Sequence, residues 1–299
     1  MRKILLASTA LIAMTSASAM AADITIGGSA ALIYSNDAAK TADGGAISAE
    51  QDINFNFSHT FDNGMTAGSS FYLDESIGAG TGDNGAGWDD LNWTLSNTPL
   101  GTLKITPGGV SSNVVKGMND KVNFAGEGSD ITADGPFDDS KGTGTVIGIT
   151  LPPLASGLTV NMEHGIDHFG IGASMAAGPA TVNVAQIKNA TTTGTTAGVV
   201  ASLSGITLGY EQNKSEAGAT EKTGTIMGVK YTMGDMTLAY EDSQLETGST
   251  KTDTSKQLQV SYTITPGISA VASTSEVATA INATQVDKDI TELQLKVSF

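Results

Sequence analysis

Apolar and polar residues alternate in many stretches of about ten residues, and this alternation constrains the fold more than any other feature. In the last stretch, "DITELQLKVSF", Leu293, Leu295, Val297 and Phe299 are apolar and the residues between them are polar. Because successive side chains of a strand point to opposite faces, each stretch predicts a β-strand with one apolar face. No helical period of about 3.6 residues persists, so we expect an all-β fold.

The connections between the expected strands are of two kinds. Tight turns such as "DNG" at 62–64 are rich in Gly, Pro, Asp and Asn, which favour sharp reversals of the chain. Longer polar stretches, such as "NKSEAGATEKTG" and "SQLETGSTKTDTSK", carry much of the charge. The two kinds alternate along about sixteen expected strands, which predicts an antiparallel meander with short turns at one end and long polar loops at the other.

The first 21 residues have the pattern of a secretory signal peptide. Arg2 and Lys3 precede an apolar run over residues 4–14, and Ala19-Met20-Ala21 fits the small-x-small cleavage rule. The run is too short for a membrane-spanning helix, and no later apolar run is long enough. We therefore expect residues 1–21 to be removed on export and residues 22–299 to fold.

Composition narrows the class of protein further. The sequence has no cysteine, so a disulfide framework is not expected. Its formal net charge is −16, and loss of Arg2 and Lys3 makes it more negative by two. Such a surface repels phosphate groups, which argues against a nucleic-acid partner. Arg2 is the only arginine, so the exported chain would have none.

A closed barrel in a membrane accounts for these features together. In hydrocarbon every backbone N–H and C=O needs an internal partner, and a closed barrel provides one for each. Closure requires the last strand to pair with the first, so Leu295, Val297 and Phe299 are the predicted closure and assembly signal. The prediction is an all-β, transmembrane, antiparallel up-and-down β-barrel of about sixteen strands.

Several stretches resemble the Gram-negative general porins, in particular those of alphaproteobacteria. They are "ADITIGGSAALIY", "FNFSHTFDNGMTAGSSFYLDESIGAGTGDNGAG", "LGTLKI" and the terminal "LQLKVSF". The resemblance implies a homotrimer in the outer membrane of a Gram-negative bacterium, in contact with its lipid. It also implies a water-filled channel for passive diffusion of small hydrophilic solutes and ions, without enzymatic activity.

The resemblance further implies that the third outer loop folds inward and narrows the pore. The longest irregular stretch, residues 108–142 between the fifth and sixth expected strands, is the candidate constriction loop. It contains Lys116, Lys121 and Lys141 and a larger number of carboxylates. The candidate acidic residues of the constriction are Asp120, Glu127, Asp130, Asp134, Asp138 and Asp139.

The resemblance implies a basic cluster on the barrel wall opposite those acids. Lys104, Lys230 and Lys296 each lie between two apolar residues, so the alternation turns them toward the interior, and they are the candidates. The basic cluster of the family typically contains arginines, and the exported chain would have none. An acidic pore concentrates cations, so we expect a channel that prefers cations.

No residue pattern predicts a catalytic site, a cofactor or a strong metal site. "GTGDNGAGWDD" and "DGPFDDS" combine carboxylates and glycines but lack the EF-hand spacing, so at most weak Ca²⁺ binding by the acidic loops is predicted. The alternatives to a diffusion porin are a substrate-selective outer-membrane channel and an acidic, secreted, β-rich surface protein. A barrel enzyme is a further alternative, but no nucleophile–base pair stands out in the sequence to support it.

Overall fold

The computed structural model describes residues 23–36, 46–77, 87–107, 114–115, 118, 121–125, 137, 144–281 and 284–299. The predicted signal peptide, residues 1–21, lies outside them. Within the described residues no helix is both long and apolar enough to cross a membrane.

The described residues form sixteen antiparallel strands, as the alternation predicted. The first eight are β1 (Asp23–Ser35), β2 (Ala46–Thr60), β3 (Thr66–Ile77), β4 (Gly87–Thr98), β5 (Gly101–Thr106), β6 (Val146–Thr150), β7 (Leu158–His164) and β8 (His168–Ala177). The second eight are β9 (Ala180–Asn189), β10 (Thr192–Leu203), β11 (Ile206–Ala217), β12 (Thr220–Met233), β13 (Met236–Thr247), β14 (Thr250–Thr265), β15 (Ile268–Ile281) and β16 (Thr284–Ser298).

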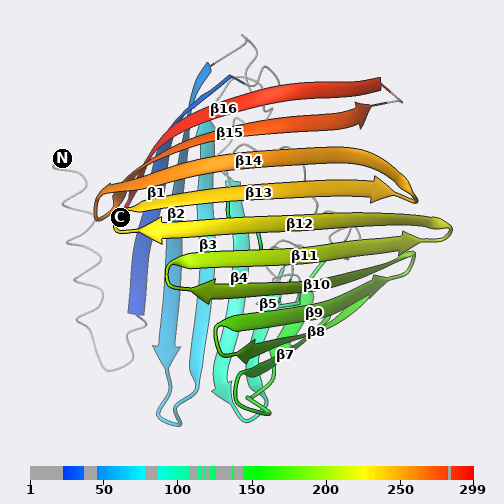
Figure 1. The fold of residues 1–299 in the computed structure, drawn as a ribbon. Coiled ribbons are helices and arrows are strands. Elements are labelled where there is room, and N and C mark those ends of the chain that lie inside the picture. Colours follow the sequence, from blue (N-terminus) through cyan, green and yellow to red (C-terminus); the bar gives the residue numbers. More distant parts are fainter. Residues whose placement is uncertain are drawn as a thin grey trace.

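Each strand pairs with its neighbours in sequence, and β16 pairs with β1, so the sheet is a closed barrel (Figure 1). At the seam Leu32 lies opposite Leu295. The Phe299 N–H donates to the Gly28 oxygen at 3.0 Å, and the Gly28 N–H donates to the Phe299 oxygen at 2.9 Å. The predicted closure through the terminal strand is therefore present down to the last residue.

Burial along the strands is the reverse of that in a water-soluble domain. On β16, Glu292 and Gln294 are buried and face inward, whereas Leu293 and Leu295 are exposed on the outer face. The strands β8, β9, β11 and β15 repeat this alternation. On the outer face Phe61, Tyr231, Tyr262 and Phe299 lie beside the short turns or the terminus. An apolar outer face and a polar interior are what a barrel in lipid requires.

The long polar loops predicted for the second half of the chain are wrong. "NKSEAGATEKTG" forms the ends of β11 and β12, and Ala217 pairs with Thr220 across a two-residue turn that contains Gly218 at φ +62°. The β13–β14 hairpin has the same short turn, and Figure 1 shows tight turns at both ends of these strands. A strand that is polar on both faces is still stable where both faces meet water, because its ladder of backbone hydrogen bonds continues.

Gly28 is expected to be required for closure. A Cβ added there would lie 2.5 Å from the backbone oxygen of Asp52 on β2 and 2.8 Å from Phe299 Cζ, so Gly28→Val would strain the β1–β2 pairing and displace the terminal ring. Overpacking of this kind costs about 1–3 kcal/mol, and we expect the folded band on unheated SDS gels to be lost at a lower temperature. The control is Ala201→Val, which adds similar bulk to the outer side of β10, far from the seam. Equal heat resistance of the two variants would contradict this role of Gly28.

Candidate constriction site

The connection between β5 and β6 enters the interior of the barrel. We call its described residues between 114 and 125 the inner segment. Val115, Met118, Val122 and Ala125 of this segment are buried, as is Phe137 further along the connection. Large apolar side chains on the outer face of the barrel are exposed. The side chains of this connection are buried instead, because they contact the inner wall.

Two apolar clusters join this connection to the inner wall. Val115, Met118 and Phe137 pack with Ala185 and Ile187 of β9. Further along, Val122 packs with Ile226 of β12, and Phe124 and Val200 cover that pair. The apolar positions on the otherwise polar inner face therefore mark where the segment lies.

Three inward-facing glutamates accept hydrogen bonds from backbone N–H groups of the inner segment. The Val115 N–H donates to Glu163 Oε2 of β7 at 2.8 Å, and the Lys121 N–H donates to Glu211 Oε2 of β11 at 2.9 Å. The Phe124 N–H donates to Glu241 Oε2 of β13 at 3.0 Å. All three glutamates are buried. We call them the anchor glutamates.

Glycines on the wall leave room for the side chains of the inner segment. A Cβ added at Gly209 of β11 would lie 2.7 Å from Val122 Cγ1 and 2.9 Å from Phe124 Cζ. One added at Gly228, the partner of Gly209 on β12, would lie 2.7 Å from Phe124 Cδ2. Only a residue without a side chain allows the segment to approach the wall this closely. We call Gly209 and Gly228 the glycine floor.

Lys230 connects the segment to the wall by a further contact. Its ammonium nitrogen lies 5.1 Å from the centre of the Phe124 ring, a cation–π distance. The ring of Phe124 thus lies close to the glycine floor on β11 and β12 and to a lysine of β12.

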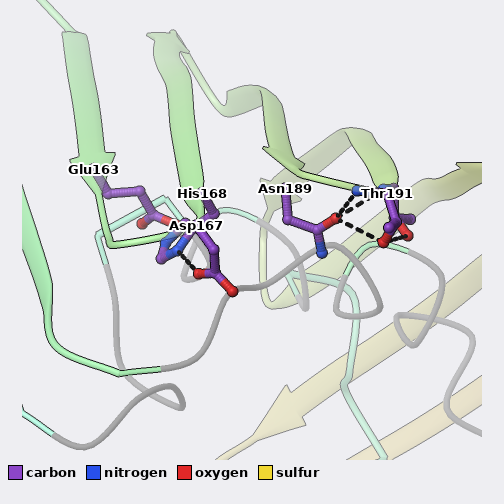
Figure 2. Close-up of polar contacts among 6 residues, drawn as sticks. Glu163, Asp167, His168, Asn189 and Thr191 are labelled. Atoms are coloured by element: carbon purple, nitrogen blue, oxygen red, sulfur yellow. Dashed lines mark hydrogen bonds and ion pairs between the residues drawn. The ribbon is translucent and has the colours of Figure 1, made fainter.

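One end of the inner segment meets a polar cluster where β7 turns into β8. Glu163 Oε1 lies 3.5 Å from His168 Nε2, and Asp167 Oδ1 lies 3.6 Å from His168 Nδ1. Figure 2 shows His168 between these two carboxylates and, nearby, Asn189 closing the turn between β9 and β10. Asn189 Oδ1 accepts from the N–H groups of Thr191 and Thr192 at 2.9 and 2.7 Å.

The predicted acidic residues of the constriction loop cannot be placed. They all lie outside the described residues: Asp120, Glu127, Asp130, Asp134, Asp138 and Asp139. The bounds 108–142 and the acidic constriction therefore stay predictions. What the structure adds is that the described parts of this connection lie inside the barrel.

The three predicted wall lysines occupy inward-facing positions. Lys104 on β5 pairs with the buried Gly148, Lys230 contacts the ring of Phe124, and Lys296 follows the buried Gln294 on the same face of β16. Their role as the basic side of a pore stays a prediction. Leu295, Val297 and Phe299 lie at the seam, and their role in assembly likewise stays a prediction.

Sequence reasoning missed the anchor glutamates. Glu211 and Glu241 occur in the related stretches "TLGYEQ" and "TLAYED", where the alternation turns each glutamate inward beside an outward tyrosine. That repetition was a usable signal. Their partners are backbone N–H groups of a distant segment, which no residue pattern reveals.

No metal centre appears in the described part of the chain, where no three His, Cys, Asp or Glu side chains are grouped to hold an ion. The two stretches for which weak Ca²⁺ binding was predicted lie largely outside the described residues, so that binding stays a prediction.

Comparison with known proteins decides the family. A family model described as "Gram-negative porin" matches residues 7–299. This chain belongs to the Gram-negative porin family. It is accordingly a channel of the outer membrane, and its apolar outer face lies in lipid.

Solved porin structures share the fold of this porin. A triple mutant of the Rhodopseudomonas blastica porin has 14% sequence identity and a TM-score of 0.64, over 93% of this chain and 100% of that one. A porin refined at 1.8 Å resolution has 16% identity and the same TM-score and coverage. Identity this low supports the fold alone. Among curated proteins no match to this porin was found.

Filling the glycine floor is expected to narrow the pore. In Gly209→Val the new side chain would collide with Val122 and Phe124, and the wall behind it cannot move, so the inner segment shifts toward the barrel axis. We expect a lower single-channel conductance in planar bilayers. The control is Thr207→Val, an isosteric change on the same face of β11. Unchanged conductance in Gly209→Val would contradict the close packing of segment and wall.

Proposed function

We propose that this porin is a diffusion channel that prefers cations and that it works as a trimer. The described residues of the inner segment lie along the wall from β7 to β13, so we place the path for solutes along the wall that they do not cover, β14–β16 and β1–β5. Loop and wall together would form the constriction, as the family resemblance implies.

The observation that carries the cation preference is the charge of the inner wall. Among the described inward-facing side chains, carboxylates outnumber lysines. On the strands that border the proposed path, the carboxylates are Glu50, Asp52, Asp253 and Glu292 and the lysines are Lys104 and Lys296. The other inward-facing charges lie on the wall that the inner segment crosses: Glu163, Glu211, Glu241, Lys222 and Lys230. A narrow aqueous path with acidic walls concentrates cations and repels anions. The six predicted loop carboxylates would add to this field.

A substrate-selective channel gains no support from the described wall. Along β14 and β15 the described inward-facing side chains include hydroxyls and amides, namely Ser255, Gln257, Ser273 and Ser275, and β15 adds Val271 and Val277. The hydroxyls and amides interact with water and with many polar solutes alike, which suits general diffusion. The closed barrel rules out the secreted β-rich surface protein.

The cation preference is testable by reversal potentials. In planar bilayers under a KCl gradient, we expect a potential whose sign shows K⁺ preference. The preference should shrink at high salt, because the Debye length falls from about 10 Å at 0.1 M to about 3 Å at 1 M. A preference for Cl⁻ would contradict the acidic constriction and leave the barrel assignment intact.

The trimer is supported by small residues on the outer face near the seam. Ala30 on β1 and Ala49 on β2 line a groove of about 260 Å³ together with Leu295 and Val297 of β16. Small outward side chains allow another barrel to approach closely, and an apolar face gains from such contact within the membrane.

We expect Ala30→Trp to prevent trimer formation. The indole would fill the groove and hold a second copy away from it. Light scattering of the detergent-solubilised protein should give a trimer mass for the wild type and a monomer mass for the variant. Ala201→Trp, on the outer face of β10, is the control and should remain trimeric. A monomeric wild type would contradict the trimer, and a trimeric Ala30→Trp would contradict the choice of this face.

A further inference from the structure

We propose that Glu163, Glu211 and Glu241 are positioning residues whose joint function is to keep the inner segment against the wall and the lumen open. This inference deepens the proposed diffusion function and rests on it for its readout. It does not depend on the sign of the ion preference or on the trimer.

The anchor glutamates are distributed so that they hold the segment along its length. They come from β7, β11 and β13, six inter-strand spacings in all, or about 29 Å measured along the wall. Their partners Val115, Lys121 and Phe124 lie within nine residues of one another, a length of chain that reaches at most about 32 Å. The segment is not fully extended, because the Met118 N–H donates to the Val115 oxygen at 3.0 Å. The partners follow one another along the segment in the order of the strands along the wall, so each glutamate fixes a different point of the segment.

The chemistry of each contact suits an irregular segment. Backbone N–H groups outside a ladder need an acceptor when they are removed from water. An ionised carboxylate is acceptor-only and has two oxygens, so it can bond to the segment and to the wall at once. Glu211 does both, because Oε2 accepts from the Lys121 N–H while Oε1 accepts from Asn213 Nδ2 at 2.8 Å.

The other two anchors have further contacts of the same kind. Glu163 Oε2 accepts from Val115, and its Oε1 faces His168. Next to Glu163, Asn161 Nδ2 donates to the Val114 oxygen at 3.0 Å, so this end of the segment is held through a donor as well as an acceptor. Glu241 Oε2 accepts from Phe124 at 3.0 Å and from Ala125 at 3.5 Å.

The barrel does not depend on these bonds for its own ladder. Glu211 pairs through its backbone with Gly198 and Ile226, and Glu241 pairs with Gly228 and Gln257, whatever side chain is present. Burial of three carboxylates is costly unless each is paired, and their partners on the segment supply part of that pairing. Loss of an anchor should therefore release the segment without opening the barrel.

A released segment can move only into the lumen, because the wall lies behind it. In the double variant Glu211→Ala, Glu241→Ala we expect transient closures in single-channel recordings. The ratio of closed to open time should rise by roughly tenfold for each anchor lost, the size expected for one charge-assisted hydrogen bond. Glu211→Gln keeps one acceptor oxygen, so it should show fewer closures than Glu211→Ala.

The matched control is Asp52→Asn. Asp52 is an inward carboxylate on β2, on the opposite side of the barrel, where it accepts from Ser29 Oγ at 3.1 Å. Its substitution removes one wall charge, so it should weaken the cation preference without adding closures. If the closures of the anchor variants came from the loss of a wall charge, Asp52→Asn would show them too. If they come from the loss of a contact with the segment, Asp52→Asn should not show them.

Two outcomes would overturn the proposal. If the double variant showed a changed reversal potential but wild-type closures, the glutamates would act through charge alone. If its folded band were lost at much lower temperature on SDS gels, they would belong to the stability of the barrel itself. A wild-type channel that preferred anions would contradict the proposed cation preference. The closures of the wild type and the double variant could still be compared, and they alone test the role of the anchor glutamates.

Discussion

The structure depends on the requirement that every backbone N–H and C=O within the membrane has a partner inside the protein. A sheet with two free edges cannot meet this requirement, so the last strand has to pair with the first. In this porin the pairing extends to the final residue, where Phe299 and Gly28 exchange two hydrogen bonds. Closure in turn fixes which side chains face lipid and which face the interior.

The interior of the closed barrel is polar, so polar side chains can be buried there and can bind the inner segment. Buried carboxylates are costly in a protein interior unless they are paired. Here they accept hydrogen bonds from a segment that has no ladder of its own, while glycines on β11 and β12 let its side chains approach. Wall and segment are therefore complementary surfaces, and the shape of the lumen follows from both.

Much of the fold could be predicted from the sequence, because the residues of a strand in lipid alternate between an apolar outer face and a polar inner face. The stretches of alternating residues along the chain predicted the right number of strands. In the last of them, Leu293, Leu295 and Val297 were correctly predicted to face outward. The same alternation placed Lys104, Lys230 and Lys296 on inward positions. The prediction of long outer loops was wrong because polar stretches such as 213–224 continue the strands beyond the apolar face of the barrel.

The sequence by itself determined the class of fold, the face of each strand and the closing pair of strands, since these depend on local alternation and on the needs of the backbone. Only the tertiary structure decided where the inner segment lies and what holds it. The partners of Glu211 and Glu241 are main-chain N–H groups about ninety and more than one hundred residues away. A main-chain group is the same in every residue, so no pattern of side chains can show that it will meet a carboxylate across the lumen.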